Sequence, residues 1–333
     1  MADPERGQEA TGDFELVAAC PTCGAPVGGH DSFCESCGAE LGPETVSIPL
    51  PSGRDHAELN LGLLAGVTDR RLRHVRNEDA MALAAADGPD GPVAIAVVCD
   101  GVSTSPRADD ASLTATQASV RALLNSARRG DDPAEASLAG VQAAHQALSK
   151  IGSPGDAPSA TYISALIDST AVTVCWLGDS RAYWLGADRP GPTRLSTDDS
   201  LAEELVARGV LEEAEAMASP QAHVITRWLG ADVTEPRPHV ARFEPPGPGV
   251  VLVCSDGLWN YEPEAAALAA LALPVALTDP FAAAATLVKF ALDAGGMDNI
   301  TAVLTPFPLA PFSADDPGEV PHPKTLPGPR LET

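Results

Sequence analysis

Short apolar runs that alternate with turn residues dominate the chain from about residue 60 onward. Two of these runs, VAIAVVC at 93–99 and GVVLVCS at 249–255, are continuously apolar, which is typical of strands buried on both faces. Residues 108–128 and 133–150 are instead rich in Ala and Leu, with apolar positions at helical spacing. The pattern predicts a domain that contains both buried strands and helices.

Further runs extend this pattern on both sides. LGLLAGVT and DAMALAAA precede VAIAVVC, and the three are predicted to form a meander of strands. TAVTVCWL and RAYWL are separated by Gly178, Asp179 and Ser180, a short polar connection that is typical of a hairpin. SATYISALI, VITRWLG and residues 299–305 are other strand candidates, and Glu264 to Ala294 is expected to form two Ala-rich helices.

The order of these elements distinguishes between fold classes. Strands follow one another in blocks and helices do the same, which favours an α+β fold over a doubly wound sheet. Two sheets packed face to face, with helices covering the outside, would bury all of the apolar runs. The charged stretch from Asp198 to Met217 interrupts the strands with two short helical pieces, and we expect it to be a mobile flap.

Composition adds size and charge to this picture. A chain of 333 residues with 44% apolar content can hold one large domain and a small accessory module. Acidic residues outnumber basic ones by 46 to 21, so the formal charge of −25 is expected to repel nucleic acid and anionic membranes. Proteins and metal ions are therefore the predicted partners.

We expect neither a targeting segment nor a membrane-spanning segment in this sequence. It begins with MADPERGQEATGD, which is polar and acidic and lacks the apolar region of a secretory signal. The apolar stretch from Ala265 to Leu277 is shorter than the ~20 residues of a spanning helix and contains Pro274, so it is predicted to be a core helix. We expect a cytoplasmic protein, and a monomer.

Four cysteines near the N-terminus have the spacing of a metal-binding module. They are Cys20, Cys23, Cys34 and Cys37, in the pattern C-x2-C, ten residues, C-x2-C. Such a set can bind one tetrahedral Zn²⁺ with all four positions filled, so we predict a structural zinc site that resembles a zinc ribbon. The alternatives to zinc binding by these cysteines are disulfides or a redox dithiol. For the role of the ribbon, docking to a protein or autoregulation is favoured over nucleic-acid binding.

These signals divide the chain into five predicted segments. They are a disordered N-terminus (1–18), the zinc ribbon (19–40), a linker (41–58), the main domain (59–307) and a Pro-rich disordered tail (308–333). Removing the residues before Asn60 is therefore expected to spare the activity of the main domain. The other cysteines, Cys99, Cys175 and Cys254, lie in apolar runs and are expected in the core.

Four short acidic signatures stand at the ends of the strand-like runs. They are Asn77-Glu78-Asp79, Asp100-Gly101, Asp256-Gly257 and Asp298-Asn299. One Asp-Gly pair after a strand is usually turn chemistry. Four signatures together predict carboxylates that converge, because buried strand ends that carry charge need a partner. Oxygen ligands suit Mg²⁺ or Mn²⁺, and such a site most often serves hydrolysis of a phosphate ester.

An ordered set of motifs carries a family resemblance. In chain order the motifs are TDRRLRHVRNEDA, VVCDGVS, SATYISALI, LGDSRAYWL, LSTDDS, VITRWLG, VLVCSDGLW and GGMDNITAVL. With them, residues 59–307 resemble the PPM-type metal-dependent serine/threonine phosphatases, also called protein phosphatase type 2C, of the bacterial kind. The resemblance implies a four-layer α/β/β/α sandwich with two Mn²⁺ or Mg²⁺ ions. It also implies hydrolysis of phosphoserine or phosphothreonine on proteins that serine/threonine kinases phosphorylate.

The resemblance also implies roles for single residues in binding the ions. Asp100 corresponds to the carboxylate that bridges them, and Gly101 to a residue that contributes its backbone carbonyl. Asp256 and Asp298 correspond to the remaining ligands of the first ion.

Three further acidic residues complete this implied set. Glu78 corresponds to a ligand of the second ion, and Asp79 to its hydrogen-bonding neighbour. Asp179 corresponds to a carboxylate that can hold a third, weaker ion in bacterial members, although a plain turn explains this residue equally well.

The chain departs from the family pattern at three places. His74 stands where the family has its phosphate-binding arginine, so the candidate cations for phosphate are His74 and the nearby Arg76. Val102 replaces a histidine that is a possible general acid in many eukaryotic members. Ser103 and Thr104 replace a Gly-Gly pair.

The implied mechanism is direct attack by a hydroxide that the two ions generate and share, so no side-chain nucleophile is required. Two other functions stay open at this stage. One is a catalytically silent relative that binds phosphoproteins or signals through the ribbon, and the other is a zinc-dependent nucleic-acid binder. The complete acidic set favours catalysis, because buried carboxylates without a partner are costly, and the charge of −25 disfavours nucleic acid.

Overall fold

The computed structural model describes residues 18–19, 26–27, 36, 44–47, 55–70, 76–153, 155–189, 191–212, 215–216, 219 and 222–310. The chain divides into two compact units, Met1–Gly42 and Pro43–Thr333. In the first unit, β1 (Ala18–Ala19) pairs with β2 (Pro26–Val27) in a two-stranded antiparallel sheet. The zinc ribbon stays a prediction, because its ligands lie outside the described residues: Cys20, Cys23, Cys34 and Cys37. Residues 1–17 and 311–333, which fall in the predicted disordered segments, also lie outside them.

The second unit contains two six-stranded antiparallel sheets. The strand order of the first is β14-β10-β9-β7-β6-β3, and that of the second is β12-β11-β15-β16-β5-β4. The first consists of β3 (Glu44–Ser47), β6 (Asp79–Gly88), β7 (Gly91–Asp100), β9 (Tyr162–Ile167), β10 (Val172–Leu177) and β14 (His239–Phe243). The second consists of β4 (His56–Asn60), β5 (Ala65–Asp69), β11 (Arg181–Gly186), β12 (Thr193–Arg194), β15 (Gly249–Cys254) and β16 (Ile300–Phe307). Two short strands, β8 (Ser159–Ala160) and β13 (Leu229–Gly230), pair with each other.

Capping residues explain where the main helices begin and end. Gly130, with a φ of 72° in the left-handed region, follows the last residue of α1 (Ala108–Arg129). The Asp132 carboxylate accepts two backbone N–H groups at the start of α2 (Pro133–Ile151), whose proline suits the first turn. Further helices within the described ranges are α3 (Leu201–Ala207), α5 (Asp256–Trp259), α6 (Ala265–Ala276) and α7 (Pro280–Asp293).

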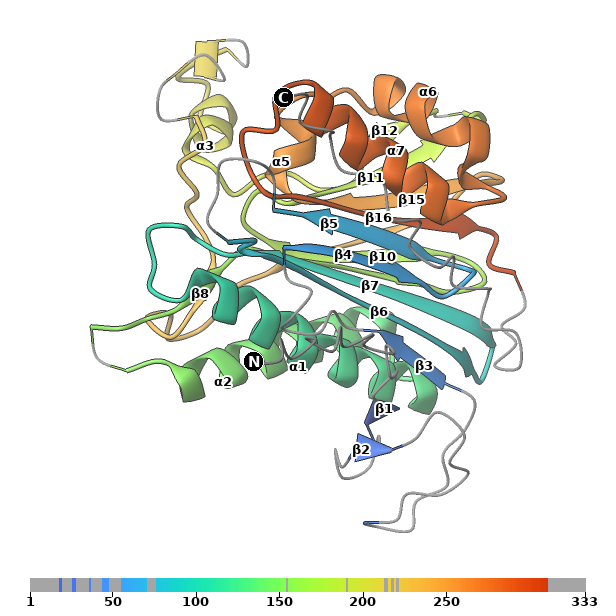
Figure 1. The fold of residues 1–333 in the computed structure, drawn as a ribbon, viewed down its shortest axis with the longest axis horizontal. Coiled ribbons are helices and arrows are strands. Elements are labelled where there is room, and N and C mark those ends of the chain that lie inside the picture. The colour runs from blue at the N-terminus through green and yellow to red at the C-terminus, as the bar shows by residue number, and fades with distance from the viewer. Residues whose placement is uncertain are drawn as a thin grey trace, which may run out of the picture. The chain divides into compact units, whose positions relative to one another are not determined.

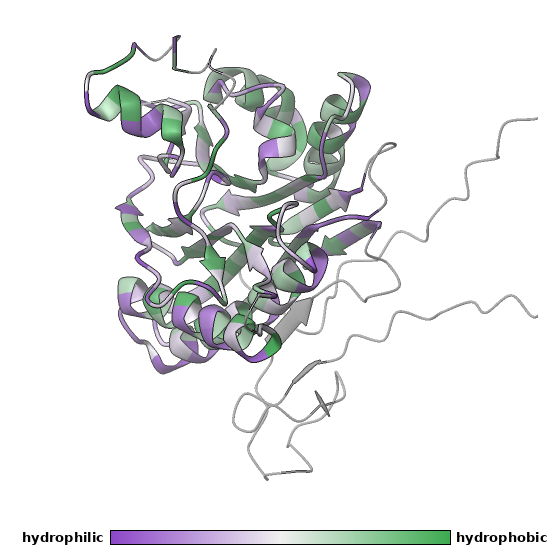
Figure 2. Ribbon diagram, turned by 90° about the vertical axis from the view of Figure 1, so that its left-hand side faces the viewer, coloured by the Kyte–Doolittle hydropathy of each residue, from purple (hydrophilic) through white to green (hydrophobic). Residues whose placement is uncertain are grey.

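Among the described residues of the second unit, three large apolar cores hold the sheets and helices in layers. Helices α1 and α2 pack on the first sheet around Leu123 and Tyr162, and the two sheets pack on each other around Met81 and Trp184. Helices α6 and α7 cover the second sheet around Leu287. Figure 1 shows this order of helices, sheet, sheet and helices, and Figure 2 shows hydrophobic residues along the strands of both sheets. The predicted sandwich of two antiparallel sheets flanked by helices is confirmed.

Two predicted strand connections are wrong. The turn from Gly178 to Ser180 does not close a hairpin, because β10 pairs with β9 and β14 in one sheet whereas β11 pairs with β12 and β15 in the other. The predicted meander is also divided, since β5 belongs to the second sheet and only β6 and β7 are neighbours. A short turn between two apolar runs has the same local sequence whether it stays within a sheet or crosses to the next one.

The predicted linker at 41–58 contains parts of both sheets. Strand β3 pairs with β6 at the edge of the first sheet, and β4 pairs with β5 at the edge of the second. Leu59 at the end of β4 is 8% exposed and belongs to the core between the sheets. Because edge strands need only one apolar face and one pairing partner, these segments lack the long apolar runs that reveal central strands.

The strand prediction for VITRWLG is mostly wrong, since only Leu229–Gly230 forms a strand there. The predicted helices at 108–128, 133–150 and within 264–294 are confirmed as α1, α2, α6 and α7. Strand β14 was not predicted, because its partly exposed sequence HVARF gives little apolar signal. In the described part of the chain, no helix has both the length and the apolar character needed to span a bilayer.

Candidate functional site

Both sheets bring acidic residues to the same side of the sandwich, where several of their strands begin or end. We call this side the acidic edge; it is distinct from the edge strands of the sheets. Asp79 at the start of β6 is paired in register with Asp100 at the end of β7. In the second sheet, Asp256 lies two residues after the last residue of β15, Cys254, and Asp298 lies two residues before the neighbouring strand β16. Asp179 lies in the turn by which the chain crosses between the sheets. Sequence positions far apart are therefore gathered by strand ends.

Asp100 is the centre of this acidic cluster. Burial raises the pKa of its carboxyl well above the ordinary value, and the nearby carboxylates raise it further: Asp79, Asp256, Asp179 and Asp298. These four charged groups, which act most strongly on Asp100, all have the same sign as its own carboxylate. Buried like charges destabilise one another, so the cluster as it stands favours protonation or a bound cation.

The carboxyls of Asp79 and Asp256 show the same electrostatic conflict. Burial raises the pKa of each to about 7, against hydrogen bonds that lower it. The opposing bonds come from Ser255 and Thr301 to Asp79, and from Asn260 and Asp100 to Asp256. One buried oxygen of each carboxyl, Oδ1, has no hydrogen-bond partner among the described residues. A buried acceptor without a partner is costly, and each is free to bind a cation.

These observations test whether the residues suit divalent ions. The donors are carboxylate oxygens and backbone carbonyls, the ligands that Mg²⁺ and Mn²⁺ prefer. No three His, Cys, Asp or Glu side chains within the described ranges already surround a point as metal ligands would. The acidic residues therefore suit divalent ions by the chemistry of their oxygen donors and by the buried oxygens that have no hydrogen-bond partner. Complete coordination of an ion would require some of these side chains to change position.

Glu78 and Gly101 lie beside the aspartates. The Glu78 carboxylate accepts a hydrogen bond from Ser103 Oγ at 2.7 Å, and its backbone carbonyl accepts the N–H of Gly101 at 3.0 Å. A Cβ on Gly101 would lie 2.4 Å from the carbonyl oxygen of Ala108, so only glycine fits there. Asn299 adds a further tie, because its Oδ1 accepts the backbone N–H of Glu78 at 2.8 Å.

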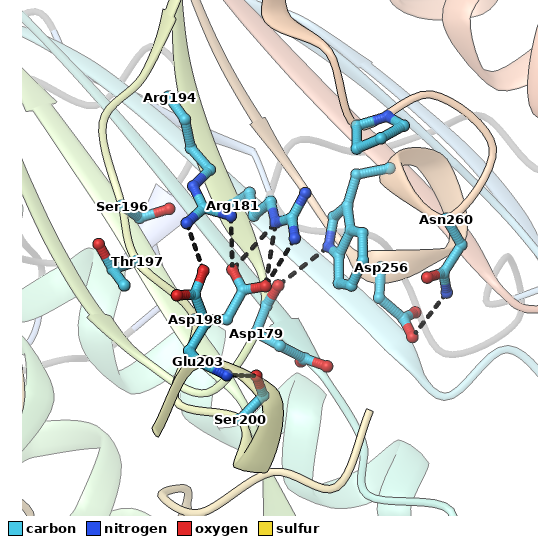
Figure 3. A network of polar contacts seen from close by, with 12 residues as sticks. Asp179, Arg181, Arg194, Ser196, Thr197, Asp198, Ser200, Glu203, Asp256 and Asn260 are labelled. Atoms are coloured by element: carbon cyan, nitrogen blue, oxygen red, sulfur yellow. Dashed lines mark hydrogen bonds and ion pairs between the residues drawn. The ribbon is translucent and has the colours of Figure 1, made fainter. Parts of the chain in front are cut away.

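Asp179 is held by a buried polar network that no sequence motif predicts (Figure 3). Trp259 Nε1 donates to the backbone carbonyl of Asp179 at 2.9 Å. The guanidinium of Arg181 lies 3.6 Å from the Trp259 ring centre and donates to Asp198, with Nη2 to Oδ2 at 2.7 Å. Burial and the charges of Asp256 and Asp198 raise the pKa of Asp179 well above its ordinary value.

The same network connects the turn to the predicted flap. Asp199 accepts the N–H of Gly178 at 3.1 Å and donates its own N–H to the Gly178 carbonyl at 2.9 Å. Ser200 Oγ accepts the N–H of Glu203 and caps α3. The motif LSTDDS therefore holds the turn with its aspartates and starts α3 with its serine. The spacing of the motif gives no signal for the roles of its aspartates, because Arg181 and Gly178, their partners, lie 17 and 21 positions away in the sequence.

Arg76 and His74 are the two candidate phosphate-binding cations. Arg76 is at the surface, with its side chain 67% exposed, and its Nη1 is 3.5 Å from Asp109 Oδ2. Its backbone carbonyl accepts from Asn299 Nδ2 at 3.3 Å, which places the Arg76 backbone next to the acidic signature at 298–299. His74 lies outside the described residues.

The raised pKa values of Asp79 and Asp256 predict how stability depends on pH when divalent ions are removed. The pKa of each is 3.8 ordinarily and about 7 in the folded protein. Between these values the folded state binds more protons than the unfolded chain, so the free energy of unfolding falls as pH rises. We expect the melting temperature in EDTA to fall as pH rises from about 4 to about 7, and to recover when Mn²⁺ is added. A pH-independent melting temperature in EDTA would contradict a buried cluster without a neutralising partner.

Two antiparallel sheets between helices, with aspartates of both sheets at one edge, define a mixed α/β protein with an acidic, oxygen-rich site. A family model described as Protein phosphatase 2C matches residues 68–289, most of the second unit. The chain belongs to the protein phosphatase 2C family.

Individual relatives and solved structures agree with this family. The serine/threonine phosphatase stp of Listeria innocua is 33% identical over 145 residues, which are 43% of this chain and 55% of the relative. The chain thus spans about half the length of the curated relatives it matches. The crystal structure of the Mycobacterium tuberculosis serine/threonine phosphatase PstP/Ppp has a TM-score of 0.57 at 27% identity, covering 72% of this chain and 96% of that one. The catalytic domain of PstP in complex with two manganese ions has the same fold, with a TM-score of 0.57 at 23% identity, covering 73% and 97%.

Proposed function

We propose that this chain is a metal-dependent protein phosphatase that hydrolyses phosphoserine and phosphothreonine on proteins. The observation that carries the proposal is the buried cluster of aspartates around Asp100, whose strongest charged neighbours are all acidic. Family membership and the names of the relatives, which are serine/threonine phosphatases, support this chemistry.

The proposed ligands of two Mn²⁺ or Mg²⁺ ions come from the acidic edge. They are Asp100 as the bridging carboxylate, the Gly101 carbonyl, Asp256, Asp298 and Glu78, with Asp79 as a hydrogen-bonding neighbour and Asp179 for a third ion. When bound, the ions would lower the pKa of a water molecule and neutralise the phosphate charge. The PstP structure with two manganese ions supports the number and kind of ion.

Other residues of the chain hold the ligands and meet the substrate. Thr161, which lies between β8 and β9, accepts the backbone N–H of Asp100 at its Oγ1 at 3.0 Å and shares a hydrogen bond with Ser180 at 2.9 Å. It thereby connects the end of β7 to the turn that carries Asp179. The exposed guanidinium of Arg76 would bind phosphate, together with His74. Val102 cannot protonate the leaving group, so that proton would come from solvent.

The cysteines of the core do not offer a rival nucleophile. Cys99, Cys175 and Cys254 are buried, and burial raises the pKa of each thiol, in Cys175 to about 12. A thiol with a raised pKa is protonated near neutral pH and is a weak nucleophile. We therefore propose direct attack by water without a covalent phospho-enzyme.

Phosphate release from a phosphothreonine peptide tests the proposal. We expect turnover with Mn²⁺ or Mg²⁺, loss of turnover in EDTA, and recovery when the ion is restored, because the acidic cluster needs a cation to hold phosphate. Turnover that persists in EDTA would end the two-ion proposal. Binding of the phosphopeptide without any turnover would instead indicate a catalytically silent relative.

A further inference from the structure

Arg107 has a backbone conformation that is unusual for its residue type. Its φ is 53° and its ψ is 46°, in the left-handed region, and no other non-glycine residue of the described ranges has a positive φ. A Cβ makes this region unfavourable, so residues with side chains stay there only where surrounding contacts hold them. Arg107 immediately precedes α1 and ends the loop that leaves Asp100 and Gly101.

Contacts of the side chain explain how Arg107 is held. Its Nη2 donates to the carbonyl of Ile151 at 2.7 Å and to Asp156 Oδ2 at 2.7 Å. Ile151 is the last residue of α2, and a cation at the C-terminus of a helix is favourable for the helix dipole. The guanidinium therefore connects the loop after Asp100 to the end of a neighbouring helix.

The left-handed turn sets the position of the residues that follow it. The carbonyl oxygen of Ala108 packs against Gly101 so closely that a Cβ on residue 101 would not fit. The Arg107 carbonyl accepts the N–H of Ala111 at 3.0 Å and begins the hydrogen bonds of α1. A different φ at residue 107 would move Ala108 either away from Gly101 or into contact that is too close.

The same loop touches other parts of the proposed centre. Ser103 Oγ donates to Glu78 at 2.7 Å. Ser105 is tied to Ser159 twice, since its Oγ donates to the Ser159 carbonyl at 3.4 Å and accepts the Ser159 N–H at 3.2 Å. The loop from 101 to 107 thus carries one proposed carbonyl ligand and one contact to a proposed carboxylate ligand.

We propose that Arg107 is a positioning residue, whose bonds to Ile151 and Asp156 hold a left-handed turn that places Gly101 and Ser103 for ion binding. This inference rests on the metal centre of the proposed function. Arg107 itself is not one of the proposed ion ligands or phosphate-binding residues.

Direct Mn²⁺ binding to the full chain, measured from the EPR signal of free Mn²⁺, tests this role. Substitution of a residue that orients metal ligands without contacting the metal typically lowers metal affinity about 10–100-fold. We expect Arg107→Ala to weaken Mn²⁺ binding about tenfold. Arg107→Gly should bind close to the parent affinity, because glycine accepts the left-handed turn without any side-chain bond. Asp156→Ala should weaken binding, and the Arg107→Ala, Asp156→Ala double variant should be no weaker than Arg107→Ala, since the Asp156 side chain acts through its bond to Arg107.

Arg129→Ala is the matched control, because Arg129 pairs with Asp131 at the opposite end of the same helix. It should leave Mn²⁺ affinity unchanged. The inference is overturned if Arg107→Ala binds like the parent, if Arg129→Ala weakens binding equally, or if glycine at 107 binds as weakly as alanine. Melting temperatures in EDTA confirm that each variant is folded at the assay temperature. Because binding is measured directly, these results hold even without turnover, whereas unchanged Mn²⁺ binding by Asp100→Asn would show that the proposed centre itself is wrong.

Discussion

Asp100→Asn is expected to abolish turnover while making the ion-free protein more stable. Asparagine keeps the shape of the side chain but removes the charge that would bridge two ions, so we expect phosphopeptide hydrolysis to fall at least about 10³-fold. The same change removes the carboxylate that lies among four others. In EDTA at neutral pH the melting temperature should rise, by about 2–4 °C for each kcal/mol of repulsion relieved in a domain of this size.

The opposite signs of these two effects make the test specific. A substitution that merely damages the fold lowers both activity and melting temperature. Asp293→Asn is a suitable control, because Asp293 is exposed on α7 and pairs with Lys289, and it should change neither quantity appreciably. Retention of most activity in Asp100→Asn would contradict the assignment of the bridging ligand.

Two N-terminal deletions should have very different outcomes. Deletion of residues 1–42 removes the first compact unit and is expected to abolish zinc binding while leaving phosphatase activity and Mn²⁺ binding in place. Deletion of residues 1–59 also removes β3 and nearly all of β4. We expect this longer deletion to unfold or aggregate the protein, because β5 and β6 would lose their edge partners and Leu59 its place in the core.

Circular dichroism, size-exclusion chromatography and elemental analysis distinguish these outcomes. The structure thereby changes the expectation from sequence, which placed the start of the main domain at residue 59. A folded and active protein after deletion of 1–59 would show that β3 and β4 are dispensable. Loss of activity on deletion of 1–42 would show instead that the cysteine unit takes part in catalysis, and zinc retained after that deletion would place the zinc elsewhere.

The central elements were predictable because each has a strong local cause. Strand β7 is apolar throughout its middle, and α2 has an Asp-Pro start with apolar positions at helical spacing. The edge strands β3, β4 and β14 were not predicted as strands, because pairing on one side and partial exposure leave a weak pattern. Gly178 to Ser180 shows a further limit, since nothing local distinguishes a hairpin from a crossing between sheets.

The residues of the candidate site are likewise of two kinds, those that the sequence indicates and those that only the structure reveals. Glu78, Asp100, Asp256 and Asp298 could be named in advance because each follows or precedes an apolar run, where a charge is conspicuous. Asp198, Asp199 and Arg107 could not be assigned a role, because each acts through partners remote in sequence or through a backbone angle.

The sequence by itself determined the class of fold, the acidic signatures and the cysteine spacing, since these depend on periodicity and residue type over short distances. Only the tertiary structure decided which sheet each strand joins, that the main domain begins within the apparent linker, and which residues support the acidic edge. Those features depend on pairing between segments up to some 230 positions apart, such as Asp69 with Ile300, and a local pattern contains no information about such distant partners.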